Sequence, residues 1–208
     1  RPDLVGTAYN QYGDMRLLYA VSGETGDILW QHFLPDNYIS RCSDTPRACD
    51  SSNPCPTGET CELRDGAVMR LTRPTVADLD GDGLPEIAAF IRDLVPFEGE
   101  DYLLALEADP ASADDPQGQR IEMWRTKAQD HGGDPPAVSA ADLDGDGSAE
   151  VLWSGVCSGF TILDGTTGTI LYRDVRSHSA SAFDYPVAAD VDADGKLEIV
   201  TGTYTEAS

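Results

Sequence analysis

One acidic pattern is written three times along the chain, and it restricts the possible folds more than any other feature. Residues 77–87 read ADLDGDGLPEI, residues 141–151 read ADLDGDGSAEV and residues 189–199 read ADVDADGKLEI. A proline and a short apolar stretch precede each copy, and a strand-like apolar run follows it. Recurrence of this kind predicts a repeat architecture, in which each repeat contributes one supersecondary unit.

The rest of each repeat favours β-structure. Residues 18–31 and 160–174 each contain two β-rich runs around a Thr-Gly turn, which is typical of a hairpin. The middle repeat keeps both strands but lengthens the turn, and Trp30, Trp124 and Tyr172 fall at one equivalent position. No stretch shows sustained helical periodicity. Four antiparallel strands per repeat is the pattern of a propeller blade, with a solenoid as the alternative.

We therefore predict an all-β fold, namely a β-propeller of four-stranded antiparallel blades. About three blades are present, so that the chain is an incomplete propeller or a fragment. The repeat units run over residues of about 1–83, 84–147 and 148–195, the next unit starts at 196–208, and a cysteine-rich insert occupies 41–66 within the first unit.

Each acidic loop begins as a calcium-binding loop does, with acids at positions 1, 3 and 5 and glycine at position 6. An EF-hand needs a bidentate glutamate at position 12, where this chain has Ala89, Trp153 and Thr201. The loops share instead an acid at position 9. Asp3 falls in register with these acids, so we expect the given sequence to open inside a fourth loop whose leading acids are missing.

We expect about three Ca²⁺ ions, because four carboxylates in one turn repel each other unless a cation is present. A solvated acidic turn is the alternative. The expected ligands are the side chains at positions 1, 3, 5 and 9 with the carbonyl at position 7, namely Asp78, Asp80, Asp82, Glu86 and Leu84; Asp142, Asp144, Asp146, Glu150 and Ser148; and Asp190, Asp192, Asp194, Glu198 and Lys196.

Four of the five cysteines lie close together in a segment poor in core-forming residues: Cys42, Cys49, Cys55 and Cys61. Such a segment needs a covalent constraint to hold a shape, so we expect two disulfides, with three pairings open. A zinc site is the alternative, although no CxxC spacing or nearby histidine supports it. Disulfides imply an oxidising compartment. Cys157 is left over, and we interpret it as a small buried apolar residue.

The composition excludes some partners. A formal net charge of −23 argues against nucleic acid and anionic membrane surfaces, because both would repel the chain. No apolar run approaches the ~20 residues that span a bilayer. The first residue, Arg1, does not open a signal peptide, so we expect a processed or excerpted chain.

Candidate enzymatic residues are few, and we predict that the chain is not an enzyme. GVCSG at 155–159 has the outline of a nucleophile elbow around Cys157, but it joins two expected strands instead of a strand and a helix. The three histidines, His32, His131 and His178, are scattered and match no catalytic or metal-binding spacing.

The three DxDxDGxxE-type loops between β-rich runs resemble the integrin alpha-type propeller repeats known as FG-GAP or VCBS repeats, here of the bacterial kind because the FG and GAP portions are poorly kept. The resemblance implies calcium between the first two strands of each blade. It also implies a closed ring of about seven blades, and hence a larger parent chain or self-assembly. Members are commonly secreted or surface proteins that bind glycans, matrix or other proteins, and some are accessory to hydrolases or lyases.

A second resemblance concerns AVSGETGDILW at 20–30, which looks like the docking repeat of pyrroloquinoline quinone dehydrogenases. It departs from that repeat at Ser22, and the equivalent stretch ends in Tyr172 instead of tryptophan. No separate quinone-site signature accompanies it. Hairpin packing between blades explains the same residues.

Together these features predict a secreted or cell-surface calcium-binding propeller module for adhesion or recognition of a glycan, matrix or protein ligand. The long loops at 42–61, 108–118 and 126–136, with the aromatic residues Tyr38 and Phe97, are the candidate partner surface. The alternatives are an accessory propeller domain of a secreted enzyme (hydrolase, lyase or quinoprotein-like) and a structural component of an extracellular assembly.

Overall fold

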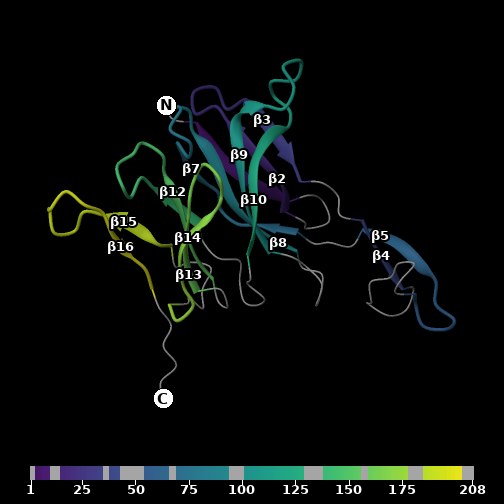
Figure 1. Ribbon diagram of the computed structural model, residues 1–208. Coiled ribbons are helices and arrows are strands. Elements are labelled where there is room, and N and C mark those ends of the chain that lie inside the picture. The colour runs from purple at the N-terminus through teal and green to yellow at the C-terminus, as the bar shows by residue number, and fades with distance from the viewer. Residues whose placement is uncertain are drawn as a thin grey trace.

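The computed structural model describes residues 3–9, 15–34, 38–42, 54–65, 69–93, 101–128, 138–155, 159–177 and 185–202. Every regular element among these residues is a β-strand, and every strand pairing is antiparallel (Figure 1). The strands form three larger sheets and two strand pairs. No helix within the described residues is both long and apolar enough to pass through a membrane.

The first sheet has the strand order β1-β2-β3, with β1 (Leu4–Tyr9), β2 (Met15–Val21) and β3 (Ile28–Phe33). The turn between β2 and β3 closes when the Gly26 N–H donates to the Ser22 carbonyl at 2.9 Å, with φ of 81° at Gly26. The turn at the corresponding place in the third sheet closes the same way, from the Gly168 N–H to the Asp164 carbonyl at 2.9 Å. Both predicted Thr-Gly hairpins are confirmed.

The second sheet has five strands that fill four places: β6 (Met69–Leu71), β7 (Thr75–Ala77), β8 (Glu86–Asp93), β9 (Asp101–Pro110) and β10 (Arg120–Ala128). β6 and β7 both pair with β8, so together they form one interrupted first strand. At the interruption the Thr72 N–H donates to the Phe90 carbonyl at 2.9 Å, and the Thr72 Oγ1 accepts from the Phe90 N–H at 3.2 Å. Pro74, which has no N–H to donate, follows two residues later.

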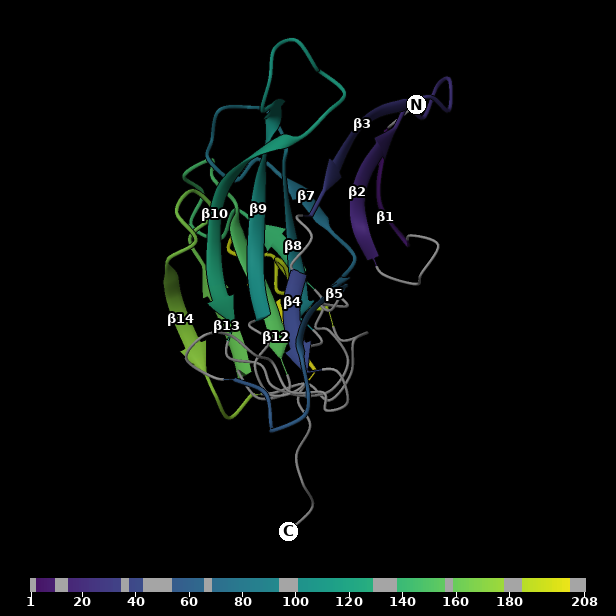
Figure 2. The same ribbon diagram turned by 90° about the vertical axis from the view of Figure 1, so that its right-hand side faces the viewer.

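The third sheet has the order β11-β12-β13-β14, with β11 (Val138–Ala141), β12 (Glu150–Gly155), β13 (Gly159–Leu163) and β14 (Ile170–Asp174). The last two strands, β15 (Val187–Ala189) and β16 (Glu198–Val200), pair with each other around the third acidic loop. The second sheet lies between the first and the third (Figure 2).

Alternate residues of β8 reach the two neighbouring sheets. Ala88 and Phe90 belong to a core cluster with the third sheet, whose members there include Val138, Val151, Trp153 and Leu163. Ala89 and Ile91 belong to a second cluster that includes Leu18 and Leu34, next to the first sheet. Because both faces of the strand are buried, β8 reads as a continuous apolar run instead of an alternating one.

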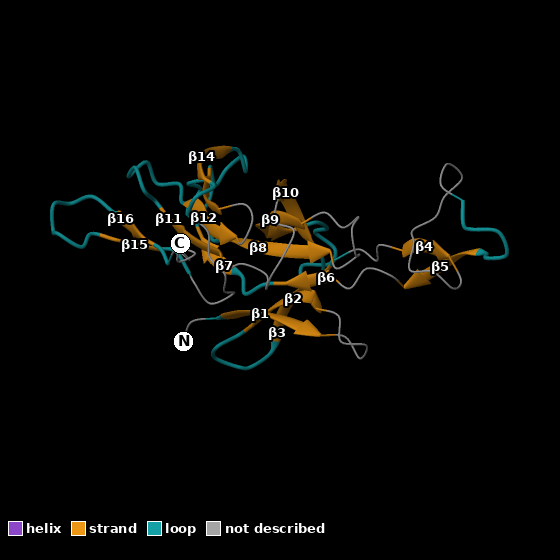
Figure 3. Cartoon of the chain, turned by 90° about the horizontal axis from the view of Figure 1, so that it is seen from below, coloured by secondary structure: helices purple, strands orange, loops and turns teal. Residues whose placement is uncertain are grey.

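The cysteine-rich segment contributes a ribbon of two strands, β4 (Tyr38–Cys42) and β5 (Cys61–Asp65), which extends away from the larger sheets (Figure 3). Cys42 and Cys61 face each other across this ribbon. Cys55 and Cys61 each take part in a disulfide bond. Cys49 and the side chain of Cys42 lie outside the described residues, so the two-disulfide arrangement of the four cysteines stays a prediction.

The all-β fold with four-stranded antiparallel sheets agrees with the sequence prediction. The second and third sheets each begin with the strand before the acidic loop, so these sheets are offset by one strand from the repeat units, which end within the loops at residues 83, 147 and 195. The first sheet has three strands because its first described strand, β1, corresponds to β8 and β12. Closure into a propeller ring stays a prediction.

Candidate metal centre

The three acidic loops, at residues 78–86, 142–150 and 190–198, are called the first, second and third loops below. In each, both oxygens of the position-1 aspartate accept backbone N–H groups. The bonds are Gly81 N to Asp78 Oδ1 (2.7 Å) and Gly83 N to Asp78 Oδ2 (2.9 Å); Gly145 N to Asp142 Oδ1 (2.7 Å) and Gly147 N to Asp142 Oδ2 (3.0 Å); and Asp194 N to Asp190 Oδ1 (3.1 Å) and Gly195 N to Asp190 Oδ2 (2.9 Å). The loop therefore wraps around its first side chain.

The aspartates at positions 3 and 5 each accept the N–H two residues ahead, as in an Asx turn. In the first loop these bonds join Asp82 N to Asp80 Oδ1 at 3.1 Å and Leu84 N to Asp82 Oδ1 at 2.7 Å. The second and third loops repeat both bonds. The alternating acids of the sequence are thus the residues that bend the backbone.

The position-9 glutamate closes each loop from the following strand. Its Oε2 accepts the N–H of position 2, at 2.7 Å from Leu79 to Glu86, 2.8 Å from Leu143 to Glu150 and 2.9 Å from Val191 to Glu198. The residues that sequence reasoning chose as a metal-binding set therefore also define the loop.

Positive φ angles complete the shared conformation. Position 6 is glycine in all three loops, with φ of 87°, 99° and 87°. Position 4 has φ of 79° at Gly81 and Gly145, but in the third loop it is Ala193, with φ of 63°. Ala193 is the only non-glycine residue with positive φ among the described residues. The third loop therefore carries a left-handed strain that the other two avoid.

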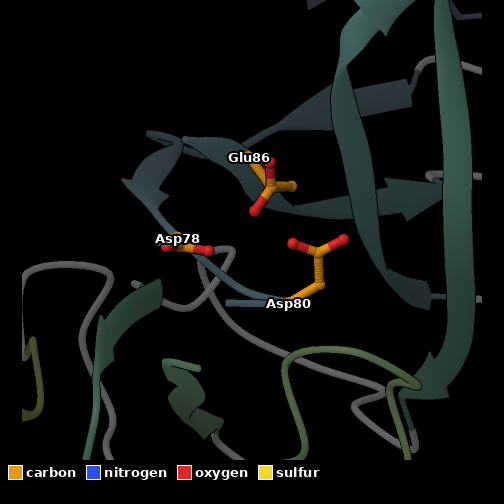
Figure 4. A group of neighbouring side chains, drawn as sticks. All are labelled: Asp78, Asp80 and Glu86. Atoms are coloured by element: carbon orange, nitrogen blue, oxygen red, sulfur yellow. The ribbon is translucent and has the colours of Figure 1, made fainter. Parts of the chain in front are cut away.

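Carboxylates gather in all three loops. Ligand atoms lie within 4.8 Å of one another in three groups that could hold a metal ion: Asp78, Asp80 and Glu86; Asp142, Asp144 and Asp146; and Asp190, Asp192 and Asp194. In the first group the three carboxylates face a common space between the loop and the start of β8 (Figure 4). Asp82, Glu150 and Glu198 lie outside these groups, and ligation by the carbonyls of Leu84, Ser148 and Lys196 stays a prediction.

The carboxyl group of Glu86 is the most unusual group of the three loops. Its side chain is 1 % exposed, and its Oε1 has no hydrogen-bond partner. Burial raises the pKa of Glu86, and the negative charges of Asp80, Asp82 and Asp78 raise it further against the opposing Leu79 hydrogen bond. A buried carboxylate oxygen without a partner is costly, and a cation would compensate it.

Glu150 repeats this environment in the second loop in a weaker form. It is 8 % exposed, and burial together with the charges of Asp144 and Asp146 raises its pKa. In the third loop all three aspartates of the cluster are exposed. The three clusters thus share a local conformation but differ in how much solvent reaches them.

Glu107, on β9, is an acidic neighbour of the first cluster that sequence reasoning missed. Ile87 pairs with Leu106, so Glu107 follows on the strand next to Glu86. Burial raises the pKa of Glu107, and the charges of Asp80 and Asp82 raise it further. Its proximity depends on the pairing of β8 with β9, so only an alignment of the expected strands would have suggested it.

The remaining sequence candidates fall elsewhere. The Asp3 Oδ1 accepts the Gly23 N–H at 3.1 Å, so this side chain is tied to the β2–β3 turn. His32 accepts the Arg120 N–H at 3.1 Å on Nδ1, which is a structural contact between the first and second sheets. Cys157, His131, His178 and Phe97, and the side chain of Tyr38, lie outside the described residues.

Comparison with protein-family models, with curated proteins and with solved structures gives no match to this chain.

Proposed function

We propose that the three acidic loops bind Ca²⁺ and that the ions stabilise the strands on either side of each loop. The observation that carries this proposal is the buried Glu86 carboxylate, whose unpartnered Oε1 lies with Asp78 and Asp80 in one cluster. Repetition of the same loop around Asp142 and Asp190 supports it. An acidic turn that only needed hydration would not require a carboxylate held away from water.

The donor set favours calcium over other metals. Each cluster offers only carboxylate oxygens, with further backbone carbonyls in the same turn, and hard oxygen donors suit Ca²⁺ and Mg²⁺. Calcium accepts six to eight oxygens in flexible geometry, whereas magnesium demands a near-ideal octahedron and keeps several waters. A short loop that supplies several carboxylates from one connection between two strands therefore suits Ca²⁺ better than Mg²⁺.

Calorimetric titration of chelator-treated protein tests calcium binding directly. We expect about three Ca²⁺ ions per chain, and a melting temperature that rises by roughly 5–10 °C for each occupied site at an ion concentration near 100 times the dissociation constant. Mg²⁺ at the same concentration serves as the control and should bind more weakly. An unchanged melt together with no binding heat would rule out the structural calcium role.

The wider role that we propose is non-enzymatic recognition outside the cell, on a propeller module of the FG-GAP or VCBS type. Its support is the calcium-loop pattern on stacked antiparallel sheets, together with the oxidising environment that the disulfide-bonded Cys55 and Cys61 require. The partner would be a glycan, a matrix component or a protein, bound by loops at the ends of the sheets. The module would belong to a larger parent chain or to an assembly.

Retention on immobilised glycans and matrix proteins, in calcium and again in chelator, tests this role. Selective retention that chelation abolishes would support calcium-dependent recognition and identify the class of ligand. Folded, calcium-loaded protein that binds none of the panel would instead favour a structural role in an assembly or an accessory role beside a secreted catalytic domain.

A further inference from the structure

We infer that the first and second acidic loops form a linked pair of ion sites, in which an ion in either site raises the affinity of the other. This inference rests on the proposed calcium binding. The linkage goes beyond calcium binding, because three loops without contacts between them would bind three ions independently. The contacts that join the two loops cross from the second sheet to the third.

A single peptide group connects the two sites. The peptide between Asp78 and Leu79 donates its N–H to the Glu86 Oε2 at 2.7 Å, inside the first cluster. The carbonyl of the same peptide accepts the Ala149 N–H at 2.8 Å. Ala149 immediately precedes Glu150 of the second loop. Any movement that reorients this peptide therefore disturbs the closing glutamates of both loops.

The turn between β13 and β14 also contacts the place where the two loops meet, which is called the junction below. The Thr166 Oγ1 donates to the Leu79 carbonyl at 3.3 Å, and the Trp124 Nε1 donates to the Gly165 carbonyl at 2.6 Å. A Cβ on Gly165 would collide with the carbonyl oxygens of Ala149 and Leu79. Gly165 is thus a positioning residue, because only glycine lets the turn approach both loops.

The third loop provides a contrast within the same chain. Leu197 occupies the position of Ala149, yet within the described residues no backbone hydrogen bond joins it to the carbonyl of Asp142. Leu197 is 38 % exposed, whereas Ala149 is 7 % exposed. The third site should therefore bind its ion independently of the second.

The linkage should be positive, because an ion bound in one site orders part of the other loop. An ion in the first site fixes Glu86, and through it the shared peptide, so the segment that carries Glu150 is partly ordered before the second ion arrives. The second ion then meets a smaller loss of conformational entropy, which raises its affinity. The reverse effect must have the same size, because linkage between two binding sites is reciprocal.

Calcium titrations of single-site and two-site variants measure the linkage. Asp192→Asn, within the third cluster, removes the third site and leaves the pair; adding Asp144→Asn or Glu86→Gln leaves the first or the second site alone. We expect the overall constant for binding two ions to exceed the product of the two single-site constants by about fivefold, the lower end of typical coupling. A ratio of one or below, with both single sites still binding, would overturn the linkage and leave calcium binding intact.

Variants of the turn separate a positioning role from a general loss of stability. Gly165→Ala and the milder Thr166→Val should bring the ratio close to one while each single site keeps its own affinity within about twofold. Thr25→Val, the same chemical change in the β2–β3 turn, should leave the ratio unchanged. If Gly165→Ala does not fold, Thr166→Val carries the test. If the turn variants keep the fivefold ratio, the junction does not transmit the linkage. If no site binds Ca²⁺, the calcium proposal itself is refuted.

Discussion

The first and third acidic loops make the same internal hydrogen bonds in different surroundings. Both wrap around their first aspartate and close through a glutamate at position 9. At position 2, however, Leu79 is fully buried in the core between the second and third sheets, whereas Val191 is 64 % exposed. The comparison teaches that the loop conformation is local, while its burial depends on the sheets that pack around it.

Burial changes what an ion can contribute. Exposed carboxylates stay hydrated and are screened by salt, so the cluster around Asp190 has little repulsion to relieve. The cluster that contains Glu86 is partly withdrawn from solvent, where charges interact more strongly. An ion in the first loop should therefore stabilise the fold more than an ion in the third.

Truncation at position 2 gives the largest difference between the two loops. Leu79→Ala should lower the free energy of unfolding by about 2–5 kcal/mol, because it removes a buried side chain and leaves a cavity. Val191→Ala should change it by less than about 0.5 kcal/mol, since the side chain is mostly exposed. Denaturant unfolding in saturating calcium measures both, and equal costs would contradict the assignment of the first loop to the core.

The second-largest difference between the first and third loops should come from replacing the glutamate at position 9. Glu86→Gln should remove the part of the calcium-dependent stabilisation that comes from the first site, about 2–3 kcal/mol at an ion concentration near 100 times the dissociation constant. Glu198→Gln should remove a smaller part. Calorimetric melts with calcium and with chelator give the comparison. The prediction fails if Glu198→Gln loses as much calcium-dependent stabilisation as Glu86→Gln does.

Much of the loop was predictable from the sequence because its interactions are local. The acids at positions 1, 3, 5 and 9, and the glycine at position 6, set the hydrogen bonds of each loop within nine residues of chain. The hairpins closed at Gly26 and Gly168 follow from equally local patterns. These features need no knowledge of which sheet lies beside which.

The features that sequence reasoning missed depend on contacts between distant segments. Glu107 approaches the first cluster only because β9 pairs with β8, and the Ala149 N–H reaches the Asp78 carbonyl only because the third sheet packs on the second. The interruption between β6 and β7 was also missed, since its repair by the Thr72 hydroxyl depends on the position of Phe90. None of these contacts has a marker in the local sequence.

The response to pH should sharpen the comparison for the buried loops. Without calcium, the raised pKa of Glu86 and of Glu150 means that the folded chain takes up these protons more readily than the unfolded chain. Their contribution to stability is therefore most favourable at low pH and is lost as pH rises through the raised pKa values. Calcium favours the carboxylate forms, so its stabilising effect should be larger at pH 7.5 than near pH 5.

Melts with calcium and with chelator across that range test this pH dependence. Glu86→Gln should reduce the change with pH, because the substituted side chain has no proton to release. Calcium stabilisation that is equal at both pH values in the unmodified chain would contradict the prediction.

The smallest expected effect concerns position 4 of the loops. Ala193→Gly removes a left-handed strain of ~1 kcal/mol, part of which is offset because glycine loses more conformational freedom on folding. The net gain should be about 0.5 kcal/mol and should be local to β15 and β16, where slower amide exchange would report it. Gly145→Ala, the reverse change in the second loop, should cost ~1 kcal/mol, because it places a side chain at φ of 79° where glycine now stands. If Ala193→Gly speeds exchange around the third loop, backbone strain is not what separates this loop from the other two, and its exposure alone must account for the difference.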